Sequence, residues 1–205
     1  MLAMLVFPLQ NPVQAAEPDY GFYQEIASVL PAGKLSIDVW NSSGENVHTQ
    51  PSQLRLGLGR LEGWLTTETL GGKLQLQRHL GVFARAGVHS RRASISELGG
   101  VFSFSDRIGR VSLSGLMFER QGQMGMQAGG LAQMKLPVFD NFGPLYAMGE
   151  LILRDHNGSE VRIAAGLRWV ARQQVTVDMW LAGSHTKDNA LFYALPAAVR
   201  VTLMF

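Results

Sequence analysis

Apolar and polar residues alternate along most of the chain from Lys34 to the C-terminus. In QLRLGLG, for example, Leu54, Leu56 and Leu58 share one side and Arg55 falls on the other. A period of two residues is the pattern of a β-strand whose two faces meet different surroundings. The pattern therefore predicts an all-β chain of about 12 antiparallel strands, with 10 or 8 as alternatives. Residues 63–67 and 98–105 alternate least clearly.

Turn-forming residues separate the predicted strands by connections of two sizes. The short connections read GRLEG, RHLG, SDRIG, DNFG and ARQQ, and the longer, more polar ones read NSSGENVHTQPS, HSRRASISE, RQGQMGMQ, DHNGS and SHTKDN. Regular alternation of short and long connections predicts an up-and-down sheet with an even number of strands.

The alternation leaves open which face meets water. A soluble barrel that binds an apolar ligand would turn its apolar side inward, and it remains one alternative. Three features favour the inverse arrangement: an unbroken apolar side rich in bulky aliphatic residues, an opposite side that mixes charged residues with Gly and Ser, and aromatic residues towards the strand ends. The aromatic residues expected to form interfacial girdles are Phe118, Phe139, Tyr146, Trp169, Trp180 and Phe192.

The chain ends in LFYALPAAVRVTLMF, a strand-like run with one wholly apolar side that finishes at Phe205. Together with the recurring two-residue period, the turn pattern and a signal-like start, this ending resembles the outer-membrane β-barrels of Gram-negative bacteria, in the small, porin-like class. The resemblance implies a closed transmembrane barrel with a periplasmic N-terminus and surroundings of outer-membrane lipid and lipopolysaccharide. It also implies that Phe205 belongs to a signal read by the barrel assembly machinery.

The first residues, MLAMLVFPLQNPVQAA, join a short apolar stretch to small residues, which is the pattern of a cleaved secretory signal. The expected organisation is a signal peptide over residues 1–16, a periplasmic lead-in or first strand over residues 17–33, and the barrel over residues 34–205. One departure is that no Lys or Arg precedes the apolar stretch.

Composition narrows the function classes further. The 205 residues carry a formal net charge of +2, and their Lys and Arg residues are scattered singly, which argues against nucleic-acid binding. The absence of Cys excludes disulfides and thiolate metal sites. The five His residues are dispersed, so neither a metal nor a cofactor is expected.

The charged side of the strands predicts the lining of the barrel lumen. The ionisable residues expected there are Asp38, Arg55, Arg85, His89, Lys135, Glu150, Arg154, Arg162, Arg168, Asp178 and Arg200. Because cations outnumber anions, one interpretation is a narrow passive channel for small solutes with a preference for anions. The other is that these charges pair across a filled interior, which would suit a structural or surface-interaction barrel of the envelope.

A third interpretation is enzymatic. The stretch DHNGSE places His156, Ser159 and Glu160 in a predicted external loop, and outer-membrane lipid A deacylases and phospholipases use His and Ser near the outer leaflet. Those families, however, carry His-x-Ser on a strand. HNGS is also a normal composition for a hairpin connection.

Overall fold

The computed structural model describes residues 25–42, 52–67, 69–87, 95–120, 122–137, 143–156, 158–172, 174–186 and 197–205. These residues form an all-β structure of 12 antiparallel strands closed into a barrel, as the sequence pattern predicted. The strands are β1 (Leu35–Ser42), β2 (Gln53–Leu58), β3 (Leu61–Thr66), β4 (Thr69–Gln77), β5 (Leu80–Gly87), β6 (Ile95–Ser105), β7 (Gly109–Arg120), β8 (Gln123–Leu136), β9 (Leu145–Asp155), β10 (Ser159–Arg172), β11 (Val175–Thr186) and β12 (Ala197–Met204). No helix among the described residues is long and apolar enough to cross a membrane.

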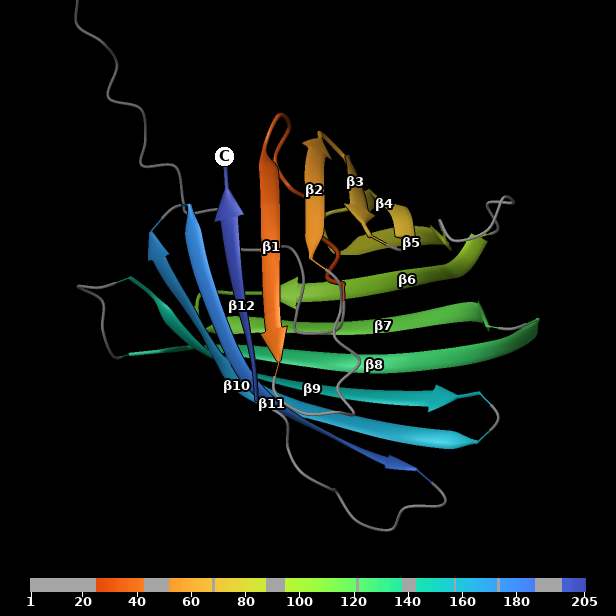
Figure 1. The fold of residues 1–205 in the computed structure, drawn as a ribbon. Coiled ribbons are helices and arrows are strands. Elements are labelled where there is room, and N and C mark those ends of the chain that lie inside the picture. Colours follow the sequence, from red (N-terminus) through yellow and green to blue (C-terminus); the bar gives the residue numbers. More distant parts are fainter. Residues whose placement is uncertain are drawn as a thin grey trace, which may run out of the picture.

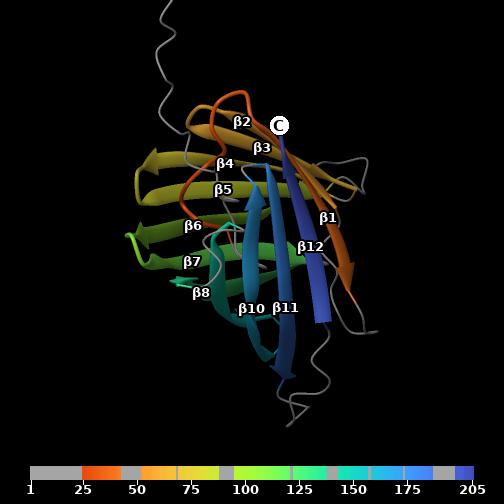
Figure 2. The same ribbon diagram turned by 90° about the vertical axis from the view of Figure 1, so that its left-hand side faces the viewer.

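Each strand pairs with its neighbours in the chain, and β12 closes the sheet against β1 (Figures 1 and 2). At the seam, the Phe205 N–H donates to the Leu35 carbonyl at 2.8 Å, and the Leu35 N–H donates to the Phe205 carbonyl at 3.2 Å. Closure satisfies the backbone of both terminal strands, which a sheet edge in an apolar medium could not do.

The barrel has two ends that differ in their connections. The terminal end carries the start of β1 and the end of β12, together with the five connections that were predicted to be short. The loop end carries the other six. Three predicted connection lengths were wrong. RQGQMGMQ is not a long connection, because Gln123–Leu136 is strand β8 and only residues 121 and 122 separate it from β7. DHNGS is also short, since residues 156–158 alone separate β9 from β10, whereas the connection at DNFG is longer than predicted and covers residues 137–144.

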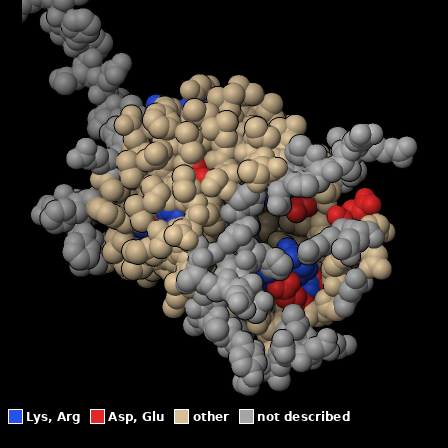
Figure 3. Space-filling model, viewed as in Figure 1, with Lys and Arg blue, Asp and Glu red and all other residues tan. Residues whose placement is uncertain are grey.

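The barrel has its apolar side chains on the outside and its charged side chains on the inside, which is the inverse of a soluble protein. In β2, Leu54 and Leu56 are 40% and 42% exposed, whereas Arg55 between them is 2% exposed. The same division recurs around the barrel, and Figure 3 shows a flank with few charged atoms beside a hollow in which Lys, Arg, Asp and Glu gather. An apolar outer face of this kind matches a hydrocarbon environment rather than water.

Large inner aromatic residues lie over glycines on the neighbouring strand. Trp64 pairs in register with Gly71, and Phe118 with Gly125. A Cβ atom at Gly71 or Gly125 would collide with the ring opposite, so these glycines make room for the aromatic side chains. The predicted interfacial girdle was therefore wrong for Phe118 and for Trp180, which are both buried inside. Phe139 and Phe192 lie outside the described residues.

Candidate functional site

An ion-pair trio spans three neighbouring strands on the inner face of the wall. Arg168 on β10 donates to both carboxylate oxygens of Asp178 on β11, at 2.8 and 3.1 Å. Arg200 on β12 donates to Asp178 Oδ2 from Nε at 2.8 Å and also from Nη2. Direct cross-strand register produces the trio, because Asp178 lies opposite Arg168 on one side and opposite Arg200 on the other.

Two tryptophans flank the trio. The Arg200 guanidinium lies 4.8 Å from the centre of the Trp40 ring and 5.8 Å from that of Trp180, and the two rings meet edge to face at 5.1 Å. This arrangement combines cation–π attraction with desolvation of the guanidinium. It fixes the position of Arg200 more firmly than the ion pair alone.

A second charged cluster joins the wall to a segment inside the barrel. Arg55 on β2 donates to Glu25 at 2.9 Å and to Glu62 on β3 at 2.6 Å, and Lys73 on β4 lies 3.2 Å from Glu25. Burial alone would raise the pKa of Glu25, but the cationic Arg55 and Lys73 outweigh it and lower the pKa from 4.5 to about 2. Glu25 therefore stays ionised at neutral pH and anchors the segment to the wall.

Residues 25–31, which we call the inner segment, precede β1 and pass through the interior (red-orange in Figure 2). The Ala27 N–H donates to Ser103 Oγ and the Leu30 N–H donates to Glu62 Oε2, both at 2.8 Å. Gly57 lets the segment approach, since a Cβ there would collide with the carbonyl oxygens of Leu30 and Pro31. The contacts to β2, β3 and β6 hold a stretch that has no strand ladder of its own.

The inner segment also makes apolar contacts with two walls. Ile26 belongs to a buried cluster with residues of β8 to β12, including Met148 and Trp180. Ala27 belongs to another, with Trp64, Phe83 and Val101 of β3, β5 and β6. The segment therefore lies across the lumen.

The loop end carries a less buried set of charges. Arg154 donates to Gln127 Oε1 at 2.8 and 3.1 Å, Arg162 donates to Glu160 at 2.9 Å, and Arg85 donates to Glu97 at 3.0 Å. Arg154 also lies 4.0 Å from Glu160, and the charged side chains of this set are 14–30% exposed, unlike those of the trio and of the Glu25 cluster. They form a polar entrance to the lumen.

The structure places most of the predicted lining residues on the inner face. Asp38, Arg55, Glu150, Arg168, Asp178 and Arg200 are buried there, Arg85, Arg154 and Arg162 are partly exposed at the loop end, and Lys135 is exposed near the terminal end. His89 lies outside the described residues. The sequence analysis missed Glu25, Glu62 and Lys73. The two-residue period places Lys73 on the same side of its strand as Gln75 and Gln77, so the sequence could have indicated that Lys73 faces the interior. Glu62, in contrast, lies in a stretch that was interpreted as a turn.

The candidate hydrolase residues do not form a catalytic arrangement. Ser159 and Glu160 are successive residues of β10 and face opposite sides of the wall, and Glu160 pairs with Arg162 on the inside. His156 packs against Phe118, and the centres of the two rings lie 5.3 Å apart. No hydrogen bond joins His156 to Ser159 in the part of the chain that the structure describes, so a nucleophile and its base are not in contact there.

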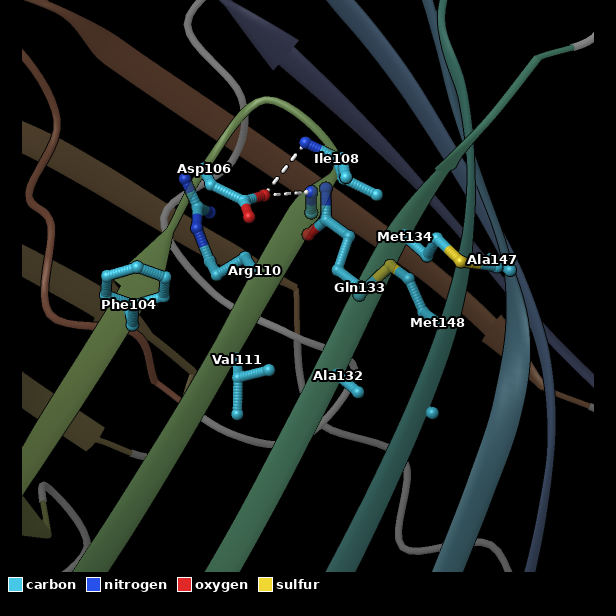
Figure 4. Close-up of a pocket in the computed structure, with 12 residues that line it drawn as sticks. Phe104, Asp106, Ile108, Arg110, Val111, Ala132, Gln133, Met134, Ala147 and Met148 are labelled. Atoms are coloured by element: carbon cyan, nitrogen blue, oxygen red, sulfur yellow. Dashed lines mark hydrogen bonds between the residues drawn. The ribbon is translucent and has the colours of Figure 1, made fainter.

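Two grooves lie on the outer face of the β6–β10 wall. One, of about 610 Å³, lies beside the β6–β7 turn between Phe104, Val111 and Met134 (Figure 4). Asp106 stabilises this turn by accepting the N–H groups of Ile108 and Gly109 at 2.8 and 2.9 Å. The other groove, of about 770 Å³, lies near the loop end. Both open outward, away from the charged lumen.

These features define the class of protein. A closed antiparallel sheet with an apolar outer face and an interior that holds the ionisable side chains is the architecture of outer-membrane β-barrel proteins. The class that the sequence resembled is thus confirmed by the barrel itself.

No protein-family model matches the sequence, and no curated protein matches it. Among solved structures, one described as the KdgM porin is similar at 9% identity and a TM-score of 0.49, over 84% of this chain and 98% of that one. Two structures of OmpT of Vibrio cholerae, one expressed in the outer membrane and one an in-vitro folded trimer form, share 8% and 9% identity with TM-scores of 0.39. Each match covers 75% of this chain and 63% or 64% of the OmpT chain, which is less than two thirds of its length.

Proposed function

We propose that the protein is a narrow, porin-like channel for small solutes in the outer membrane of a Gram-negative bacterium, with low conductance while the inner segment is docked. The observation that carries the proposal is the polar entrance, where Arg85, Arg154 and Arg162 are partly exposed on the inner face of a wall whose outer face is apolar. A polar, partly hydrated lining lowers the barrier for charged solutes.

The charge of the entrance supports a mild anion preference. Its three arginines outnumber Glu97 and Glu160, and each ion pair there is partly solvated. A residual positive potential would raise the local concentration of anions and slow the entry of cations. The terminal end, with both chain ends and the short connections, is assigned to the periplasm, and Phe205 to recognition during assembly.

The test is single-channel recording of the detergent-refolded full chain in a planar bilayer under a salt gradient. We expect small, infrequent, anion-biased steps. The double variant Arg154→Gln/Arg162→Gln should shift the reversal potential towards zero, the value for a channel that does not select between anions and cations. Arg78→Gln is the matched control, because Arg78 lies in the exposed β4–β5 turn at the opposite end and should leave selectivity unchanged. Conductance steps with no anion bias, or an equal shift of the reversal potential in the double variant and in Arg78→Gln, would contradict the role given to the entrance.

A structural barrel of the envelope is the second candidate, and the inner segment favours it. Ile26 and Ala27 connect two walls, which stiffens the barrel as well as obstructing it. Stable insertion without conductance, even after residues 25–31 are replaced by a Gly/Ser linker, would rule out the channel and leave this role.

A further inference from the structure

Buried polar atoms gather on the inner face of β1 and β11. Asp38, Ser36 and Thr176 are at most 1% exposed. Both carboxylate oxygens of Asp38, Ser36 Oγ, Thr176 Oγ1 and the indole nitrogen of Trp40 have no hydrogen-bond partner among the protein atoms. These four residues lie near one another in the sheet, since β12 alone separates β1 from β11 and Thr202 on β12 pairs in register with both Asp38 and Thr176.

An ionised carboxylate without any partner is strongly disfavoured inside a protein. Buried polar atoms are almost always satisfied, and a cluster of exceptions indicates bound water or a bound ion. Asp38 and Ser36 on β1 and Thr176 on β11 offer four oxygen atoms on two strands that β12 separates. The arrangement therefore has the composition of a small internal binding site rather than of a packed core.

The mixture of donors and acceptors distinguishes water from a cation. Asp38 can only accept hydrogen bonds when ionised, whereas the Trp40 indole N–H, two residues along the same face, can only donate. Water bridges both kinds of atom, but a cation would satisfy the oxygens alone. The nearby ion-pair trio favours water as well, because Arg168 and Arg200 against one Asp178 give the trio a net charge of +1, which is unfavourable for a further cation beside it.

We propose that the inner faces of β1 and β11 form an internal water-binding site in which ordered water molecules link the Asp38 carboxylate to the Trp40 indole N–H and to the hydroxyls of Ser36 and Thr176. The site lies towards the terminal end and next to the Glu25 cluster, because Ser36 on β1 pairs in register with Arg55 on β2. This proposal does not depend on whether the barrel conducts.

A crystal structure of the full chain in detergent, from crystals grown in Na⁺ and then soaked in Tl⁺, tests the site directly. We expect ordered, non-anomalous density within hydrogen-bond distance of Asp38 Oδ and of Trp40 Nε1. An anomalous Tl⁺ peak on Asp38 would make this a cation site and overturn the proposal. Direct protein partners for Asp38 and Trp40, or density for neither water nor ion, would also overturn it.

The contact between water and the Trp40 indole can also be measured in solution, with variants of Asp38. In detergent micelles, the Trp40 indole proton should show a cross-peak to water by NMR, assigned with Trp40→Phe. Asp38→Leu should abolish the cross-peak, whereas Asp38→Asn, which keeps an acceptor of similar size, should retain it. If Asp38→Leu does not refold, Thr176→Val is the substitute, and it should weaken the cross-peak. A cross-peak absent from the unmodified protein would refute the water link.

Discussion

Ile26 and Ala27 are consecutive residues that pack on two different walls of the barrel, Ile26 with Trp180 and Ala27 with Trp64. Successive side chains of an extended backbone point in opposite directions, so two neighbouring residues suffice to connect the walls. The contact across the lumen therefore depends on very few side chains, which makes it sensitive to single substitutions.

Replacing Ile26 by Ala should weaken docking of the inner segment. Ile26 is fully buried, and truncation of such a side chain costs about 2–5 kcal/mol. We expect the open probability in single-channel recordings to rise by one order of magnitude or more. Ile163→Ala is the matched control, because Ile163 is 44% exposed on the outer face, and an equal rise in that variant would disprove the mechanism.

Replacing Glu25 by Gln should destabilise the docked segment more than a surface change of the same kind. The variant leaves Arg55 and Lys73 buried with one carboxylate fewer, and breaking a buried pair costs about 3–5 kcal/mol. Limited proteolysis of residues 25–34 should then be at least tenfold faster. Glu97→Gln, which disrupts a partly exposed pair with Arg85, should cost about 1 kcal/mol or less and leave proteolysis unchanged.

The docking of the inner segment should resist mild acid. The pKa of Glu25 is about 2 in the docked segment, compared with 4.5 for an ordinary glutamate in water, so the ionised form stabilises docking. This stabilisation is complete above about pH 4.5 and is lost as the pH falls towards 2. Open probability should be flat from neutral pH to about 4.5 and rise below it. In Glu25→Gln the acid-induced rise should be missing, and its persistence there would assign the effect to another group.

Adding a methyl group at Gly71 should destabilise the barrel. The new Cβ would collide with the Trp64 ring, and overpacking of this kind costs about 1–3 kcal/mol. Gly63→Ala is the matched control, because no atom lies within 4 Å of a Cβ there. Urea unfolding of both variants in lipid vesicles, followed by heat-modifiable gel migration, should show a lower midpoint for Gly71→Ala alone.

The sequence predicted the barrel because alternate residues of a membrane strand face lipid and interior, so a two-residue period shows which side chains lie on each face. Arg55 between Leu54 and Leu56 is enough to assign the faces of β2, and the same reasoning succeeds from β8 to β12. It also predicted that Asp178, Arg168 and Arg200 share the charged side of the strands, and all three are buried, although the trio itself required knowledge of the register.

The inner segment could not be predicted, because its contacts come from tertiary structure. EIASVL has no strand period, and the partners of Glu25 lie 30 and 48 residues away in the chain. The mistaken connection at residues 120–127 has a local cause. Glycine is common in turns, but here Gly125 is a strand residue that accommodates Phe118.

The inner segment is continuous with β1 through residues 32–34, and Gly33 donates to the Gly57 carbonyl at 2.9 Å at the rim. A segment that leaves its position therefore remains tethered beside the lumen, at an effective concentration on the order of millimolar. Its return is an intramolecular step that no dilution can slow. Such a barrel would respond to displacement with brief flickers that end by themselves, and a lasting open state would require something that holds the tether away.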